Sequence, residues 1–153
     1  MNGATLTSLN DFNAWVTAKQ SVGEIIFEAH GQMLTASRAP SPSEEILYHM
    51  IYRLSETGAE IVASVNELPA RREPIQLIVP VIAREGERME QIDSQTVRVL
   101  KAKGALTVSI DASYGFDASF KEKTFNLVPG FEAFPFNVVL AAGKEARIRL
   151  KAR

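Results

Sequence analysis

The sequence contains no cysteine, a single tryptophan and only two histidines. Without cysteine, the chain has no disulfide, no thiol nucleophile and no thiolate ligand for a metal ion. No apolar run approaches the roughly 18 residues of a transmembrane helix, so we expect no membrane partner. The first residues also lack the basic and apolar stretches of a secretory signal, and the sequence leaves the cellular compartment undetermined.

An excess of charge of one sign is also missing. The chain has 17 Lys and Arg residues against 18 Asp and Glu residues, a net charge of -1. This balance argues against a nucleic-acid partner, because such partners bind strongly basic surfaces. With 46% apolar and 23% charged residues, the 153-residue chain has the composition of a globular protein. We expect one domain over residues 1–153, with residues 1–20 as an irregular or short helical lead-in.

The clearest pattern that is present is an alternation with a period of two over residues 46–54, typical of a β-strand with one buried face. The turn at 55–58 ends in Gly58, which predicts a bulged hairpin with this glycine in the left-handed region and with residues 59–65 as the return strand. One face of the first strand carries Ile46, Tyr48, Met50, Tyr52 and Leu54, and the other carries Leu47, His49, Ile51 and Arg53.

Similar segments follow and precede this hairpin. Residues 74–82 are almost continuously apolar, which favours a central strand buried on both faces, although Pro80 requires an edge or a bulge. Gly31 predicts a turn between two strands, and residues 102–104 predict a second hairpin. Residues 142–144 predict a third hairpin.

These signals predict about ten short strands in an all-β fold, most simply an antiparallel β-sandwich, with a barrel as the alternative. Evidence for helices is limited to residues 8–16, which fit either one helical turn or an entry strand.

Candidate catalytic groups are few. His49 lies on the opposite strand face from Tyr48 and Tyr52, so these side chains do not form a site on their own. We interpret His49 as a half-exposed strand residue and His30 as a solvated turn residue. A small lyase or hydrolase that uses His49 remains an alternative.

Other chemistry is weakly supported. No Gly-x-Ser-x-Gly motif occurs, and residues 111–117 hold too few oxygen ligands for a calcium loop. The sequence therefore predicts no catalytic residue, no metal site and no cofactor.

Exposed aromatic rings offer another route to function, because sugars stack on flat aromatic faces. Candidates for carbohydrate binding are Trp15 and a loop cluster of Tyr114, Phe116 and Phe120. Packing in the core or at an interface is the favoured explanation of the aromatic clusters.

A second aromatic cluster comprises Phe131, Phe134 and Phe136. Strand parity separates Phe131 from the other two. We therefore expect Phe134 and Phe136 in the core, and Phe131 at an edge or a docking surface.

Residues 123–135, Lys-Thr-Phe-Asn-Leu-Val-Pro-Gly-Phe-Glu-Ala-Phe-Pro, resemble the closing segment of C-terminal β-sandwich domains in heparinase II/III-like polysaccharide lyases. Residues 48–61 and 76–82 resemble two further strand units of those domains. A weaker similarity exists to immunoglobulin-like terminal domains of β-mannosidases.

The lyase resemblance implies a non-catalytic accessory domain that supports a helical-toroid catalytic domain acting on acidic polysaccharides. No residue here matches a catalytic motif of that family. A free-standing carbohydrate-binding module is the alternative.

Overall fold

The structure, a computed structural model, describes residues 6–40, 45–66, 74–111, 113–117, 124–125 and 132–152. In this part of the chain the backbone forms β-strands and one turn of 3-10 helix, η1 (Ser8–Asn10). No helix within it is long and apolar enough to cross a membrane. The strands are β1 (Trp15–Ser21), β2 (Glu24–Gln32), β3 (Leu47–Ser55), β4 (Gly58–Val65), β5 (Ile75–Ile82), β6 (Arg88–Gln91), β7 (Thr96–Lys101), β8 (Gly104–Ile110), β9 (Phe116–Asp117), β10 (Thr124–Phe125), β11 (Glu132–Leu140) and β12 (Ala146–Ala152).

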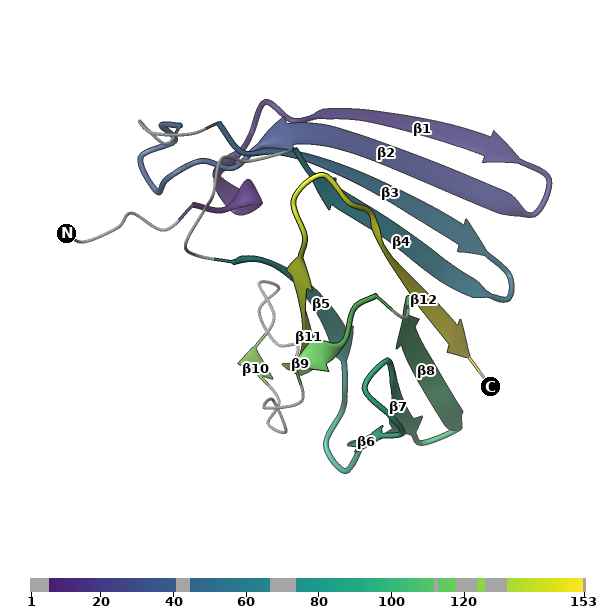
Figure 1. Ribbon diagram of the computed structural model, residues 1–153. Coiled ribbons are helices and arrows are strands. Elements are labelled where there is room, and N and C mark those ends of the chain that lie inside the picture. Colours follow the sequence, from purple (N-terminus) through teal and green to yellow (C-terminus); the bar gives the residue numbers. More distant parts are fainter. Residues whose placement is uncertain are drawn as a thin grey trace.

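The strands form two antiparallel sheets (Figure 1). The large sheet has eight strands in the order β1-β2-β3-β4-β12-β8-β7-β6. In the small sheet, β11 pairs with β5 along one edge and with β9 and β10 along the other. The predicted all-β antiparallel fold of about ten strands is confirmed, since ten of the described strands have four or more residues.

The core lies between the two sheets, where alternate side chains of each strand face inward. Phe134 and Phe136 are only 3% and 2% exposed, which confirms their predicted place in the core. The small sheet also contributes Val79, Val81 and Val138, and the large sheet contributes Ala63, Val65, Val97, Val99, Val108, Ile110, Ala146 and Ile148.

The predicted hairpin at 55–58 is present, but without a bulge. Ser55 pairs directly with Gly58 across a two-residue turn. The φ angle of Gly58 is +154°, a value that side-chain-bearing residues rarely adopt. A Cβ atom on Gly58 would also overlap the carbonyl oxygen of Leu150 on β12. Glycine is required here because β12 approaches the turn closely. This contact joins distant parts of the chain, so the sequence of the turn does not predict it.

The predicted central position of residues 74–82 is wrong. Strand β5 is an edge strand that pairs only with β11 among the described strands. Its burial alternates, with Val79 and Val81 buried and Ile78 and Ile82 exposed. Pro80, which has no N–H to donate to a second neighbour, was the more informative signal.

The predicted turn at Gly31 and the predicted hairpin at 142–144 are also wrong. Gly31 lies inside β2, which continues to Gln32, and the β1–β2 turn lies at Gly23 instead. A Cβ atom on Gly31 would overlap the Asp11 carboxylate and the Tyr48 hydroxyl. The turn at 142–144 is present but joins β11 to β12, which belong to different sheets, so it is not a hairpin.

Candidate functional site

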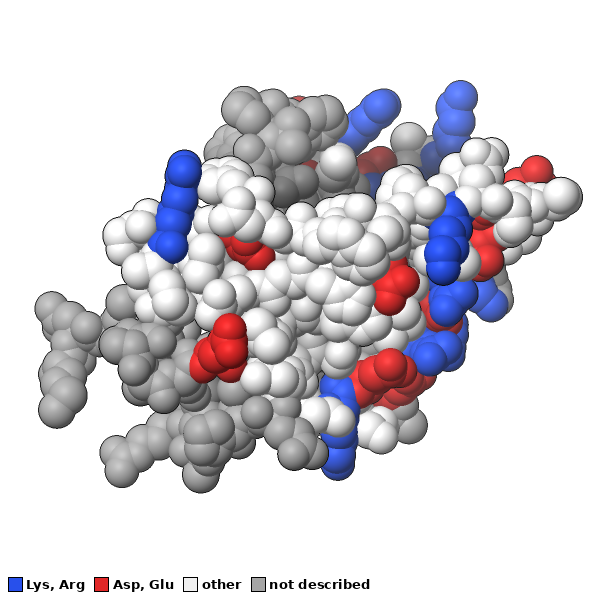
Figure 2. Space-filling view, turned by 90° about the horizontal axis from the view of Figure 1, so that it is seen from above, with Lys and Arg blue, Asp and Glu red and all other residues white. Residues whose placement is uncertain are grey.

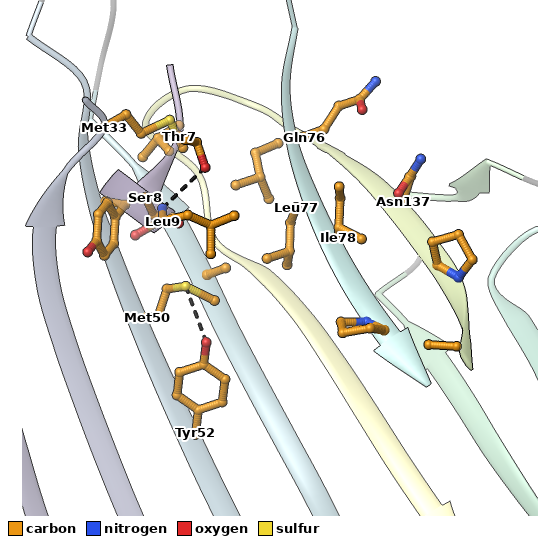
Figure 3. A pocket seen from close by; sticks show the side chains of 18 residues that line it. Thr7, Ser8, Leu9, Met33, Met50, Tyr52, Gln76, Leu77, Ile78 and Asn137 are labelled. Carbon is orange, nitrogen blue, oxygen red and sulfur yellow. Dashed lines mark hydrogen bonds between the residues drawn. The ribbon is translucent and has the colours of Figure 1, made fainter. Parts of the chain in front are cut away.

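A cleft of about 620 Å³ opens between the two sheets beside β5 (Figure 3). Met50 and Tyr52 of β3 line one side, where the Tyr52 hydroxyl donates a hydrogen bond to the Met50 sulfur (3.5 Å). Leu77 of β5 lines the other side, and Ile78 also lines the cleft, from the opposite face of that strand. Asn137 of β11 also lines the cleft; its Oδ1 is buried and receives no hydrogen bond among the described residues. The cleft is therefore mainly apolar.

The apolar surface continues beyond the cleft along the inward face of β1, β2 and β3. Cross-strand pairing places Phe27 opposite Tyr52 and Ile25 opposite Leu54 on this face. The small sheet does not reach this end of the large sheet (Figure 1). As a result Ile25 and Phe27 are each 37% exposed and Leu54 is 41% exposed. We call the four residues Val16, Ile25, Phe27 and Leu54 the uncovered apolar face.

Asp11, which precedes β1, connects the N-terminal segment to strands β2 and β3. Its Oδ2 accepts hydrogen bonds from the Tyr48 hydroxyl (3.2 Å) and from the backbone N–H of Gln32 (2.8 Å). Burial, followed by the charge of Asp11, raises the pKa of Tyr48 to about 12. Burial likewise raises the pKa of Tyr52. Both tyrosines therefore stay protonated at neutral pH.

The opposite, outward face of the large sheet brings together both histidines of the chain. His30 of β2 pairs directly with His49 of β3, and their rings stack with centroids 4.1 Å apart. Glu28 Oε1 lies 3.2 Å from Nε2 of His30 and 2.9 Å from Nε2 of His49. These hydrogen bonds, first the one with His49 and then the one with His30, lower the pKa of Glu28. His30 is thus a strand residue in a polar cluster, and its interpretation as a turn residue is wrong.

A charged network lies further along the same outward face. Glu60 of β4 lies between Arg53 of β3 (3.6 Å) and Arg149 of β12 (3.2 Å), and it also meets Arg147 (3.5 Å). Arg149 additionally pairs with Asp111 (3.3 Å). In the view from above, acidic and basic side chains lie side by side and the rest of the face is largely uncharged (Figure 2). This arrangement is a mixed-charge surface rather than a field of one sign.

Those residues predicted to bind carbohydrate that the structure describes do not lie together in one site. Trp15 of β1 is 60% exposed on the outward face, with its ring tilted against His30 at 5.4 Å. Phe116 is 7% exposed and packs against Phe136 in the core at 5.7 Å. Tyr114 packs partly buried against the core. Stacking of a sugar on Phe116 would require β9 to leave its sheet, so core packing describes this residue better.

Two predicted positions, Phe120 and Phe131, lie outside the described residues. Their carbohydrate-binding and interface roles stay predictions.

Sequence reasoning missed the cluster of Glu28, His30 and His49. The missing information was the strand register, because the misplaced turn at Gly31 removed His30 from β2. A correctly placed β2 gives Glu28 and His30 the same parity and hence the same face. The pairing of His30 with His49 depends in addition on the register between β2 and β3, which the sequence alone does not predict.

Two comparisons with known proteins point to the same family. The model of the ulvan lyase C-terminal domain matches residues 1–153. A broad-specificity ulvan lyase of Formosa agariphila is 24% identical to this chain over 132 residues, which cover 86% of this chain and 20% of that protein. The chain thus spans about a fifth of the length of this curated relative. No solved structure matches the chain.

Proposed function

Because this chain belongs to the ulvan lyase C-terminal domain family, we propose that it is a non-catalytic accessory domain of a polysaccharide lyase that acts on acidic polysaccharides. The similar ulvan lyase is about five times as long as the matched region, so most of that protein lies outside it.

The observation that carries the proposal is the uncovered apolar face. Val16, Ile25, Phe27 and Leu54 form a contiguous apolar surface next to a mainly apolar cleft. Contiguous apolar surfaces of this kind mark interaction sites on soluble domains. We assign this face to the catalytic part of the lyase, for which a helical toroid of the heparinase II/III type is the specific candidate. The domain then acts as a support against which the catalytic part packs.

A chimeric lyase tests this role. The matched region of the Formosa agariphila ulvan lyase is replaced by this chain, and cleavage of ulvan is followed by the ultraviolet absorbance of the unsaturated products. We expect the chimera with the native chain to be folded and active. Phe27→Asp places a charge in the apolar contact and should lower both the melting temperature and the activity of the chimera.

Ile92→Asp is the matched control, because Ile92 is also exposed (50%) but lies in the β6–β7 turn, outside the apolar face. In the isolated domain, Phe27→Asp should cost more than Ile92→Asp, because Phe27 is only 37% exposed and lies opposite Tyr52 within β2. The loss in each chimera is therefore compared with the loss in the matching isolated domain, and only the additional loss is assigned to docking. Equal additional losses in the two chimeras would exclude the uncovered apolar face as the docking surface.

A carbohydrate-binding module is a second candidate, favoured by the exposed indole of Trp15 on the outward face. A glycan array that includes acidic polysaccharides tests it. Binding that is lost in Trp15→Ala would support this function, whereas the absence of binding to any glycan would reject it.

A further inference from the structure

The cluster of Glu28, His30 and His49 has the donor set of a metal site, and its ligand atoms lie close together. The three side chains come from two adjacent antiparallel strands, β2 and β3, and all point to the outward face of the large sheet. Their nitrogen and oxygen atoms lie within 4.8 Å of one another. Two imidazoles and one carboxylate would occupy three coordination positions of a metal ion. The positions that face solvent would stay open to water or to another ligand, as in catalytic metal sites.

The distances fit a small divalent ion. With metal–nitrogen and metal–oxygen bonds of about 2.0–2.2 Å, two ligands of a tetrahedral zinc ion lie about 3.3 Å apart. Glu28 Oε1 already lies 3.2 Å from the His30 Nε2 atom and 2.9 Å from the His49 Nε2 atom. The two imidazoles stack nearly parallel, so their rings must turn about the side-chain torsions until the lone pairs of both Nε2 atoms point at the ion.

The sheet holds the ligands in place before any ion arrives. His30 and His49 occupy directly opposed positions, which fixes the separation of their Cβ atoms. Trp15 on β1, opposite His30, packs its ring against the imidazole. The three ligand side chains are between 31% and 44% exposed, so an ion reaches them from solvent. A neighbouring hollow of about 380 Å³, lined by both histidines, Ser64 and Lys144, leaves room for further ligands of the ion.

We propose that Glu28, His30 and His49 bind one divalent transition-metal ion, with Zn²⁺ as the expected occupant and water in the open positions. Each neutral imidazole presents the lone pair of Nε2 to the ion when its proton resides on Nδ1. The carboxylate supplies the negative charge, and imidazole and carboxylate ligands together favour zinc, nickel and copper over calcium and magnesium. This proposal is independent of the uncovered apolar face, which lies on the other side of the sheet. It departs from the prediction that the chain has no metal site.

Titration calorimetry of the full 153-residue chain with ZnCl₂ tests the site. The protein carries no polyhistidine tag and is first freed of metal with a chelator. We expect one saturable site per chain, and a higher melting temperature in the presence of Zn²⁺ because the ion binds the folded state. His30→Gln, His49→Gln and Glu28→Gln should each weaken Zn²⁺ binding by at least about tenfold, since each removes one ligand.

Glu24→Gln is the matched control, because Glu24 lies on the same strand and the same face as Glu28 but outside the cluster. Circular dichroism confirms that each variant is folded, which is expected because the substituted side chains are partly exposed. Substitution by Co²⁺ gives a second readout, since the visible absorption of the bound ion should disappear in His49→Gln. No saturable Zn²⁺ binding, or binding that is unchanged in both histidine variants, would overturn the proposal.

Discussion

Replacing Gly58 by alanine tests whether the β3–β4 turn is held tightly against β12. The φ angle of +154° is costly for any residue with a side chain, by about 1–3 kcal/mol. The new methyl group would in addition overlap the carbonyl oxygen of Leu150, a backbone atom that moves only if β12 moves. Gly58 pairs with Lys151, and the next pair is Ala59 with Leu150. Loss of about two backbone hydrogen bonds would add about 1–3 kcal/mol.

Gly23→Ala is the matched control for this substitution. Gly23 also lies in a tight turn with positive φ (+79°), but nothing lies within 4 Å of an added Cβ atom. Its substitution should therefore cost only the backbone strain, about 1–2 kcal/mol. Gly58→Ala should lose about 1–3 kcal/mol more than Gly23→Ala, which isolates the contact with β12.

Urea unfolding followed by far-ultraviolet circular dichroism measures both losses. This probe is preferable to tryptophan fluorescence because Trp15 is largely exposed in the folded protein. The comparison requires equal m values, which show that the same surface is exposed on unfolding. Equal losses for the two variants would refute the conclusion that β12 presses on the turn.

Three further predictions concern the core, the buried tyrosine and the charged network. Phe134→Ala should cost about 3–5 kcal/mol in urea unfolding, whereas Val139→Ala, at a half-exposed position of β11, should cost less than about 1 kcal/mol; similar small losses would contradict the assigned core. Because the pKa of Tyr48 is raised to about 12, its stabilising contribution is complete below about pH 10 and is lost as the pH rises towards 12, and Tyr48→Phe should flatten this alkaline decline. Glu60→Gln should cost about 1 kcal/mol, a loss that shrinks at high salt if the network with the arginines is electrostatic.

Local patterns in the sequence were sufficient for much of the fold. The alternation over residues 46–54 correctly separated the buried face of Tyr48 from the outward face of His49. The β7–β8 hairpin at residues 102–104 and the burial of Phe134 and Phe136 were also predicted correctly. In each case the signal lies within a few neighbouring residues, where strand parity and turn chemistry decide the outcome.

The errors concern residues whose environment is set by distant parts of the chain. The sequence suggests a turn at Gly31, but a glycine is needed at this strand position because the Asp11 and Tyr48 side chains occupy the space of a Cβ atom. Residues 74–82 are apolar like a central strand, although β5 has only one described neighbour. The histidine cluster likewise depends on the register between β2 and β3, which no short motif specifies.

The position of β12 has a consequence for how the molecule folds. Within the large sheet this strand lies between β4 and β8, and it joins two groups of strands that otherwise share no pairing among the described residues. Glu60 and Arg149, which meet across one of these junctions, are 89 residues apart along the chain. Contacts of such long range close slowly, so folding should take milliseconds to seconds rather than microseconds. In any chain in which β12 has not inserted, the edges of β4 and β8 are both unpaired, and such chains would be the most prone to intermolecular strand pairing.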